Sequence, residues 1–368
     1  MASWYLNMRV AIDLSPLLYS IGVSKYTEFL INSLLKIDEV NKYVLFGGSL
    51  RRFNELKEKT KQFEKKAEVK IFPYPPAIAD LIWNILHKFS VENLVGEIDV
   101  FHSSDWTEPP VKKAFKVTTV HDLYHFKFPK MVHPKILDVH MRKMKWVLSE
   151  SERIIVPSTC TKEDLISLGA KPELVRVVPE APLLPFVSKE EIALTKKKYH
   201  LREDYIYCNG ITPRKNTLNI IKAFNLSKYG KELKLVLTGR PVGVEIEEER
   251  NVRLLGHVES DNDLSAIIAG SKGLVYPSLY EGFGLPIVEA FNLGAPVVTS
   301  NISSMVETSG GAAVLVDPYD VNSIADGIEE MLSKPKTLIA KGLKRAKDFS
   351  WDKNAEETLK VYEESGEK

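Results

Sequence analysis

The chain has very few of the features that mark several large classes of protein. Its two cysteines, Cys160 and Cys208, lie far apart and in no metal-ligand spacing, which predicts buried apolar side chains in a reducing compartment. No apolar run approaches the length of a transmembrane helix. The N-terminal stretch "MASWYLNMRVAID" lacks the pattern of a secretory signal. The first convincing strand begins at Met8, and we interpret the residues before it as an extension or a start-site artefact.

Other absences exclude particular functions. The formal net charge of the 368 residues is +1, so no overall field attracts nucleic acid. No G-x-G-x-x-G follows a strand, which argues against a nicotinamide-dependent dehydrogenase, and no Walker A pattern is present. The sequence Asp261-Asn262-Asp263 has the spacing of a metal-binding Asp-x-Asp motif, but it precedes the apolar run "LSAIIAG" and is better explained as a helix start. We therefore expect no essential metal and no bound cofactor.

What the sequence does contain is an alternation of short β-rich runs with amphipathic stretches. A helix is predicted over Val23 to Ile37, where apolar residues recur at helical spacing. Such alternation is typical of parallel sheets with helices on both faces. It lapses over residues 177 to 191, where three prolines cluster. The sequence thus predicts an α/β protein with two doubly wound domains, residues 1–180 and 181–350, and a ligand site in the cleft between them.

One strand–helix–strand unit carries the strongest candidate site. Residues 277 to 300 read "PSLYEGFGLPIVEAFNLGAPVVTS", with a helix predicted from Pro286 to Asn292. The glycines of the turn allow a ligand to approach the backbone, and the N–H groups at the start of the helix favour an anion such as a diphosphate. Glu281 and Glu289 stand on either side of this turn and could accept hydrogen bonds from sugar hydroxyls. The alternative is that Glu281 is solvated and that Glu289 only stabilises the helix start.

Three further loops follow predicted strands. In "CNGITPRKNT" a strand ends at Gly210, and Arg214 and Lys215 follow, a suitable pair of side chains for two bridged phosphates. A second loop places Gly22 before the first helix, where it could approach a phosphate from the opposite domain. A third places His121 beside Asp122 at a strand end, where a ligand contact is favoured over a packing role.

These residues resemble a known family. The stretch "YPSLYEGFGLPIVEAFNLGAPVVTSNISSMVETSGGAAVLVDPYD" is similar to the signature of retaining glycosyltransferases of family 4, which have the GT-B fold of two Rossmann-like domains. "GITPRKN" resembles the phosphate loop of that family, although it is one residue shorter than the commonest form. "VHDLYHFKFPKMVHP" resembles its His-Asp segment. "FSWDKNAEETLKVYEE" resembles a last helix, residues 351–368, that packs back onto the N-terminal domain.

The resemblance implies an activity and a set of residue roles. Enzymes of this family transfer a hexose from a nucleotide diphosphate sugar to an acceptor hydroxyl with retention and without an essential metal. The C-terminal domain would bind the donor and the N-terminal domain the acceptor, a glycan or a lipid-linked saccharide. The implied catalytic residues are His121, Glu281, Arg214 and Lys215, and the implied donor-binding residues are Gly22, Gly210, Val258, Gly282, Phe283, Gly284, Leu285 and Glu289.

Several alternatives stay open on the sequence. A nucleotide-sugar epimerase or a glycan phosphorylase would use the same two-domain fold, and a sugar-binding protein without activity is the alternative outside catalysis. The similarity of the His-Asp segment to mannosyltransferases favours GDP-mannose as the donor. Two basic stretches, "RRFNELKEKTKQFEKK" and "MRKMKW", are interpreted as solvated faces, with weak contact to an anionic membrane as the alternative. The expected location is the cytoplasm, including the inner face of its membrane.

Overall fold

The computed structural model describes residues 7–19, 22–104, 106–246 and 250–367. It divides into two compact units, Met1–Glu180 with Trp351–Lys368, and Ala181–Ser350. Most of the segment before Met8 lies outside the described residues. None of the described helices is both long enough and apolar enough to cross a membrane.

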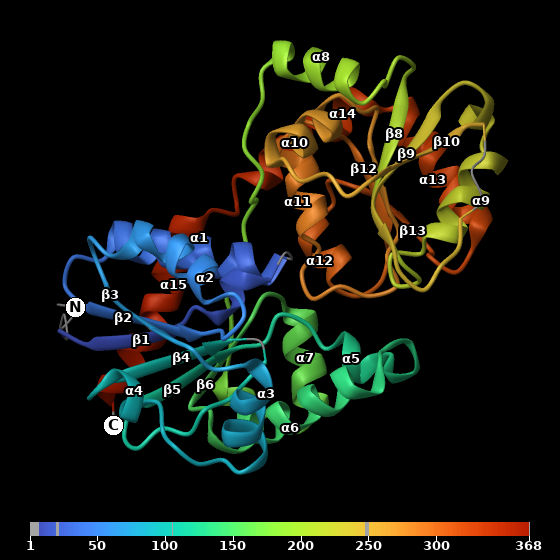
Figure 1. Cartoon of the computed structure of the whole chain (residues 1–368). Coiled ribbons are helices and arrows are strands. Elements are labelled where there is room, and N and C mark those ends of the chain that lie inside the picture. The colour runs from blue at the N-terminus through green and yellow to red at the C-terminus, as the bar shows by residue number, and fades with distance from the viewer. Residues whose placement is uncertain (1–6, 20–21, 105, 247–249, 368) are drawn as a thin grey trace. The chain divides into compact units, whose positions relative to one another are not determined.

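The first unit contains a seven-stranded parallel sheet (Figure 1). Its strand order is β3-β2-β1-β4-β5-β6-β7, the order of a doubly wound Rossmann-like sheet with one further edge strand. β1 lies at the centre and pairs with β2 on one side and β4 on the other. The strands are β1 (Arg9–Asp13), β2 (Lys42–Gly48), β3 (Glu68–Phe72), β4 (Val100–Ser104), β5 (Phe115–Thr119), β6 (Arg153–Val156) and β7 (Val175–Val177).

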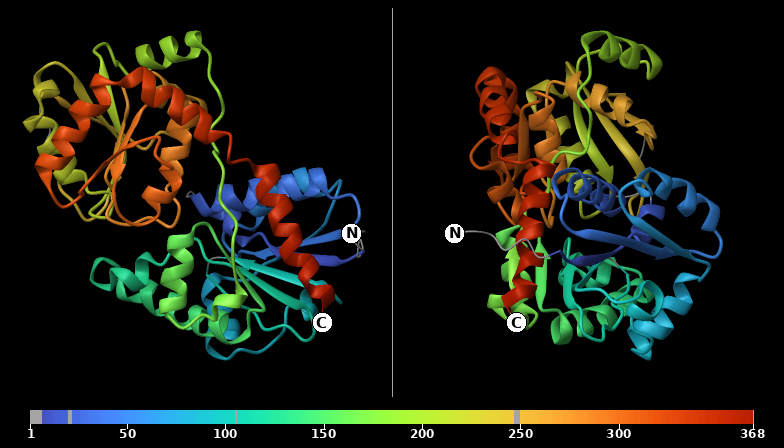
Figure 2. Two further views of the ribbon diagram at one scale, coloured as in Figure 1. Left: turned by 180° about the vertical axis from the view of Figure 1, so that it is seen from behind. Right: turned by 90° about the vertical axis from the view of Figure 1, so that its left-hand side faces the viewer.

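Helices cover both faces of this sheet. The α-helices are α1 (Gly22–Ile37), α2 (Phe53–Thr60), α3 (Pro76–Ala79), α4 (Glu92–Val95), α5 (Tyr124–Lys127), α6 (Pro134–Glu150), α7 (Thr159–Ser167) and α15 (Trp351–Glu363). α15 comes from the far end of the chain and lies beside α1, as Figure 2 shows. Trp351 of α15 packs against Tyr26 and Phe29 of α1, with ring centroids 5.5 and 5.4 Å apart. The unit is thus closed by residues that follow the second unit in the sequence.

The second unit repeats this topology with a six-stranded parallel sheet in the order β10-β9-β8-β11-β12-β13. Its strands are β8 (Tyr205–Ile211), β9 (Lys234–Pro241), β10 (Val252–Gly256), β11 (Leu274–Tyr276), β12 (Val297–Ser300) and β13 (Val314–Val316). Its helices are α8 (Lys189–Lys198), α9 (Thr217–Leu226), α10 (Asp261–Ala269), α11 (Leu285–Asn292), α12 (Ser304–Ser309), α13 (Val321–Ser333) and α14 (Pro335–Ala346). Two parallel sheets with the same winding confirm the predicted fold class.

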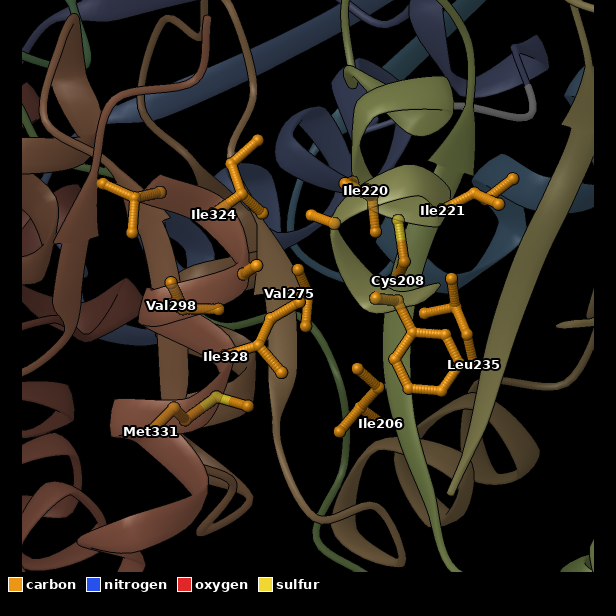
Figure 3. Close-up of a cluster of buried hydrophobic side chains, with 14 of the residues drawn as sticks. Ile206, Cys208, Ile220, Ile221, Leu235, Val275, Val298, Ile324, Ile328 and Met331 are labelled. Carbon is orange, nitrogen blue, oxygen red and sulfur yellow. The ribbon is translucent and has the colours of Figure 1, made fainter. Parts of the chain in front are cut away.

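The core of the second unit lies on both faces of its sheet, because alternate residues of each strand point to opposite sides. Ile206 and Cys208 of β8 pack against α9 and α13, whereas Tyr205 and Tyr207 pack against the helices of the other face. Figure 3 shows Ile220 and Ile221 of α9 beside Cys208, and Ile324, Ile328 and Met331 of α13 beside Val275 and Val298. Cys208 is therefore buried as predicted, but Cys160 on α7 is partly exposed, which corrects the prediction for that cysteine.

Several elements differ from the sequence-based expectation. β7 was not predicted, because three residues are too few for a periodic pattern and the chain beyond it is rich in proline. The helix after the glycine turn begins at Leu285, one residue before Pro286. β8 ends at Ile211, one residue after the predicted strand end at Gly210.

Candidate active site

The candidate site lies in the second unit, at the carboxyl ends of β8 and β11. These two strands are neighbours in the sheet but are separated in the sequence by β9 and β10. The strand order reverses between them, and ligands of doubly wound sheets bind at such a switch point. The loop after β8 carries Arg214 and Lys215, and the loop after β11 carries Glu281. The topology thus brings together residues that the sequence places in separate loops.

The loop after β8 is held in shape by its own polar groups. Gly210 has φ +84°, a conformation that glycine adopts without strain, and a Cβ there would lie 3.2 Å from Cγ of Lys215. The hydroxyl of Thr212 accepts a hydrogen bond from the backbone N–H of Lys215. Asn216 donates from Nδ2 to the carbonyl oxygens of Pro277 and Pro318. This amide side chain therefore fixes the loop to the ends of β11 and β13.

The turn before α11 presents backbone donors. Gly284 is the N-cap residue with φ +96°, and Pro286 occupies the first turn of the helix. The backbone N–H groups of Phe283, Gly284 and Leu285 donate to no other residue in the described part of the chain. Thr308 holds the turn by donating to the carbonyl oxygen of Phe283 at 2.6 Å. Unsatisfied N–H groups at the start of a helix form an anion-binding site.

A compact polar cluster joins the two loops. The carboxylate of Glu281 contacts Nη1 of Arg214 at 3.0 Å and Nζ of Lys215 at 2.8 Å. It also accepts hydrogen bonds from the hydroxyls of Tyr276, at 2.8 Å, and Ser278, at 2.7 Å. Nζ of Lys215 additionally contacts the hydroxyl of Tyr276. The carboxylate is only 7% exposed, so this cluster is shielded from solvent on most sides.

The electrostatics of the cluster follow from this geometry. Burial alone would raise the pKa of Glu281, but the charges of Arg214 and Lys215, with the hydrogen bonds from Lys215 and Ser278, lower it to about 2. Burial lowers the pKa of Lys215 below its ordinary value, although the charge of Glu281 acts against this. Burial also raises the pKa of Tyr276 well above 10, so this phenol keeps its proton and donates to Glu281. The carboxylate is therefore ionised throughout the physiological range.

Three other residues of the predicted donor site lie in the same unit. Glu289 is buried on α11, one turn after Leu285, and its charge helps to raise the pKa of the buried Tyr207 on β8. Gly282 is buried in the turn. Val258 follows β10 and packs into the core with Ile267 of α10. Packing explains the burial of Val258, and its contact with the base of a nucleotide stays a prediction.

The remaining predicted site residues belong to the first unit. His121 follows β5 and contacts the carboxylate of Glu180 through Nδ1 at 3.1 Å. Its ring meets that of Tyr26 edge to face, with centroids 4.5 Å apart. Gly22 is the first residue of α1 and is exposed. The approach of His121 to a transferred sugar, and that of Gly22 to a phosphate, stay predictions.

The Asp-x-Asp spacing has a structural explanation. Asp261 and Asp263 lie in the first turn of α10, whose N-cap is Ser260. The Asp263 carboxylate contacts Nζ of Lys198 at 2.6 Å and accepts a hydrogen bond from the hydroxyl of Tyr199. Among the residues that the structure describes, no three His, Cys, Asp or Glu side chains form a group that could hold a metal ion. The prediction of a helix start is thus confirmed, with Ser260 as the capping residue.

Sequence analysis missed three side chains of this site. Tyr276 and Ser278 contact Glu281, and Asn216 connects the two loops. Tyr276 ends β11 and Ser278 follows two residues later, so polar residues at this strand end were a usable signal. The contact of Asn216 depends on the pairing of strands distant in sequence.

Two protein-family models match the chain, each mainly in one unit. The model of "Glycosyl transferases group 1" matches residues 188–356, and that of "Glycosyltransferase Family 4" matches residues 22–181. The two matches together span most of the chain and meet near the boundary between the units.

Individual relatives of the chain include named mannosyltransferases. The O-antigen chain mannosyltransferase B of Escherichia coli is 28% identical over 96% of this chain and 99% of its own length. The serotype-specific mannosyltransferase WbdA of Escherichia coli is 32% identical over 46% of this chain, but over only 23% of its own length. The crystal structure of Anabaena HepE in complex with UDP and glucose has a TM-score of 0.68 and 16% identity, and the match covers 96% of this chain and 98% of that one. At such identity the likeness concerns the fold alone. The chain is therefore a GT-B glycosyltransferase whose two units match these two family models, and it is mannosyltransferase-like.

Proposed function

We propose that this glycosyltransferase moves mannose from GDP-mannose to a hydroxyl of a saccharide acceptor, with retention at the anomeric carbon and without an essential metal. The observation that carries this proposal is the cluster of Arg214, Lys215 and Glu281 beside the backbone donors of the turn before α11. Cations, a carboxylate and free N–H groups at one switch point are the groups that a phosphorylated sugar requires.

Arg214 and Lys215 bind the diphosphate of the donor in this proposal. As the bond to the anomeric carbon breaks, negative charge grows on the departing phosphate oxygen. Two cations held in place before the reaction stabilise that charge, which is the role that a metal ion has in other transferases. The hydrogen bonds that order the loop after β8 support this, because they fix the backbone of Lys215 before any ligand binds.

Glu281 and the turn amides bind the sugar. The carboxylate accepts hydrogen bonds from sugar hydroxyls, and its negative charge favours the positive charge that develops on the sugar ring. No residue of the site is an evident covalent nucleophile. We therefore infer that the acceptor hydroxyl attacks on the face from which the diphosphate departs, so that the configuration is retained.

Glu289 binds the ribose, and the backbone near Val258 lies by the base. The position of Glu289 one turn into α11, directly after the turn that presents the backbone donors, supports this assignment. His121, in the first unit, contacts the transferred sugar, and Gly22 contacts the phosphates. The acceptor is a saccharide, free or linked to a lipid, and relatives that are named O-antigen chain mannosyltransferases support a polysaccharide product.

The donor is tested by thermal shift and calorimetry with GDP-mannose, UDP-glucose and ADP-glucose. Since a ligand that binds the native state stabilises it by mass action, GDP-mannose is expected to give the largest rise in melting temperature. Lys215→Ala should weaken GDP and GDP-mannose about tenfold to a hundredfold, as expected for a lost charge-assisted hydrogen bond. Lys222→Ala, which removes an exposed lysine of α9, is the matched control and should leave both affinities unchanged.

Two further measurements test the reaction itself. Proton NMR of the product reports whether the anomeric configuration of the donor is kept, and inversion would contradict the proposed mechanism. Transfer in excess EDTA should continue at the rate measured without it. If turnover stops in EDTA and returns with magnesium or manganese, the assignment of the metal's role to Arg214 and Lys215 is wrong.

A further inference from the structure

A pocket of about 420 Å³ opens at the amino ends of strands of the second sheet. The candidate donor site, in the loops after β8 and β11, lies at the opposite, carboxyl ends of the strands. The lining of the pocket includes Tyr205, Lys234 and Val252, which are the first residues of β8, β9 and β10. β8 runs from this pocket to Gly210 at the donor loop, a separation of roughly 17 Å at the usual rise of about 3.3 Å per residue. The pocket, which we call the amino-edge pocket, is therefore separate from the candidate donor site.

The charge of the amino-edge pocket is strongly one-sided. Among its described lining residues are Lys234 and three arginines, Arg202, Arg250 and Arg253, against one carboxylate, that of Glu203. The whole chain has a formal net charge of only +1, so this concentration of positive charge is a local feature. A concave surface lined by one sign of charge concentrates ligands of the opposite sign.

Internal pairing leaves most of this charge uncompensated. Glu203 contacts Nζ of Lys234 at 3.3 Å, and the same Nζ donates to the carbonyl oxygen of Arg250. Arg253 donates one hydrogen bond, to the carbonyl oxygen of Tyr199 at 3.3 Å. The guanidinium groups of Arg202 and Arg250 form no hydrogen bond or ion pair with any other described residue. Within the described part of the chain, no acceptor thus occupies the donors of these two guanidinium groups, and a ligand could use them.

The shape and floor of the pocket indicate the kind of anion. A volume of about 420 Å³ lies within the range of small-molecule sites and exceeds what a lone inorganic anion fills. Leu201 and Val252 are buried and give the pocket an apolar floor. Guanidinium groups match the oxygen geometry of phosphate with two parallel hydrogen bonds. We propose that the amino-edge pocket binds a phosphate ester, with the phosphate on Arg202 and Arg250 and the organic part on the apolar floor.

Calorimetry with phenyl phosphate tests this proposal, because the probe combines a phosphate with an apolar group. Arg202→Gln with Arg250→Gln should weaken its binding at least tenfold, since two charge-assisted contacts are lost. Arg202→Lys with Arg250→Lys should be intermediate, because the charge stays and the planar fork is lost. Arg51→Gln with Lys65→Gln removes two exposed cations of the first unit and should bind like the wild type.

Lys215→Ala tests whether phenyl phosphate binds at the donor site instead. This change should alter the affinity for phenyl phosphate less than twofold. The proposal is overturned if the Arg202→Gln/Arg250→Gln variant binds as the wild type does. It is also overturned if Lys215→Ala accounts for the whole loss, or if phenyl phosphate does not bind the wild type at millimolar concentration. Circular dichroism of each variant establishes that it is folded.

The source of the phosphate is decided by sedimentation with phosphatidylcholine vesicles that contain phosphatidic acid. Binding to these vesicles that is lost in Arg202→Gln/Arg250→Gln and kept in Arg51→Gln/Lys65→Gln would identify a lipid headgroup as the ligand. Binding of phenyl phosphate without such vesicle binding would identify a soluble phosphate ester.

Discussion

The phenol of Tyr362 on α15 hydrogen bonds to Nδ1 of His102 in β4, at 2.6 Å. The other ring nitrogen, Nε2, contacts the hydroxyl of Thr119 in β5 at 2.7 Å. All three side chains are buried, and burial lowers the pKa of His102 to about 3, so the imidazole is neutral at pH 7. A neutral imidazole has one donor and one acceptor, and two hydroxyls satisfy both. The contact fixes α15 to the centre of the first sheet.

Tyr362→Phe is expected to lower the free energy of unfolding by about 1 to 3 kcal/mol, because a buried nitrogen of His102 loses its partner. Urea denaturation measures the loss, and hydrogen exchange in β4 locates it in the first unit. Tyr319→Phe, at a side chain that is 65% exposed, should change stability little. A loss below about 0.5 kcal/mol for Tyr362→Phe would show that the contact contributes no stability.

Asp13→Asn is expected to stabilise the protein at pH 7. Burial raises the pKa of Asp13 from 3.8 to about 6, so between these values the folded state binds a proton that the unfolded state does not. The contribution of Asp13 to the free energy of unfolding is therefore complete below about pH 4 and is lost as the pH rises through 6. The loss amounts to about 3 kcal/mol. Asparagine removes this loss and keeps the oxygen that accepts from the N–H of Ser15.

The measurement for Asp13→Asn is the melting temperature as a function of pH. The gain over the wild type should vanish below about pH 4. Asp38→Asn is the control of opposite sign, since hydrogen bonds from Tyr43 and Asn41 outweigh burial and lower the pKa of Asp38. This variant should be less stable than the wild type at pH 7. Equal stability of Asp13→Asn and wild type at pH 7 would contradict the conclusion that burial of the Asp13 carboxylate destabilises the folded state.

Glu281→Gln is expected to abolish transfer without weakening GDP. Glu281 pairs with both Arg214 and Lys215, so its removal leaves both cations available to the diphosphate. Calorimetry should give an affinity for GDP equal to or above that of the wild type, while initial rates fall at least a hundredfold. Glu289→Ala should instead weaken GDP and GDP-mannose together, because the ribose is common to both. If the two variants behave alike in both assays, the separate roles of these glutamates are wrong.

Ser260→Ala should lower the free energy of unfolding by about 1 kcal/mol, because Ser260 is the N-cap of α10. Asp263→Ala should also be destabilising, since it loses the contacts with Lys198 and Tyr199. Neither change should make transfer dependent on a divalent metal. If either variant has normal stability but no activity, the Asp-Asn-Asp sequence takes part in the reaction and the assignment as a helix start is insufficient.

The alternation of strands and helices was enough to predict the fold class, because parallel sheets bury both faces and leave a recognisable apolar pattern. The same reasoning predicted that Arg214 and Glu281 follow strands. It could not predict that they contact each other, since they are 67 residues apart and meet only because β8 pairs with β11. The sequence assigned Arg214 to the diphosphate and Glu281 to the sugar, whereas the structure pairs the two side chains directly.

The contact between His102 and Tyr362 was beyond sequence analysis for the same reason. Its partners are 260 residues apart, and neither belongs to a motif. Amphipathic spacing identifies which face of a helix is buried but not which polar atom it meets. Pairing of distant strands and helices therefore accounts for most of what was missed, with the short strand β7 as the one missed element of the sheets.

The place of α15 has a consequence for the order in which the protein takes shape on the ribosome. Residues 181–350 form a continuous unit, whereas residues 1–180 need Trp351 and Tyr362 to complete their core. Domains generally fold as they emerge, starting from the N-terminus. Here the nascent first unit lacks the partner of Nδ1 of His102, the hydroxyl of Tyr362, while the second unit is translated and folds. During that interval the uncovered face beside α1 is open to chaperones and to association with other nascent chains.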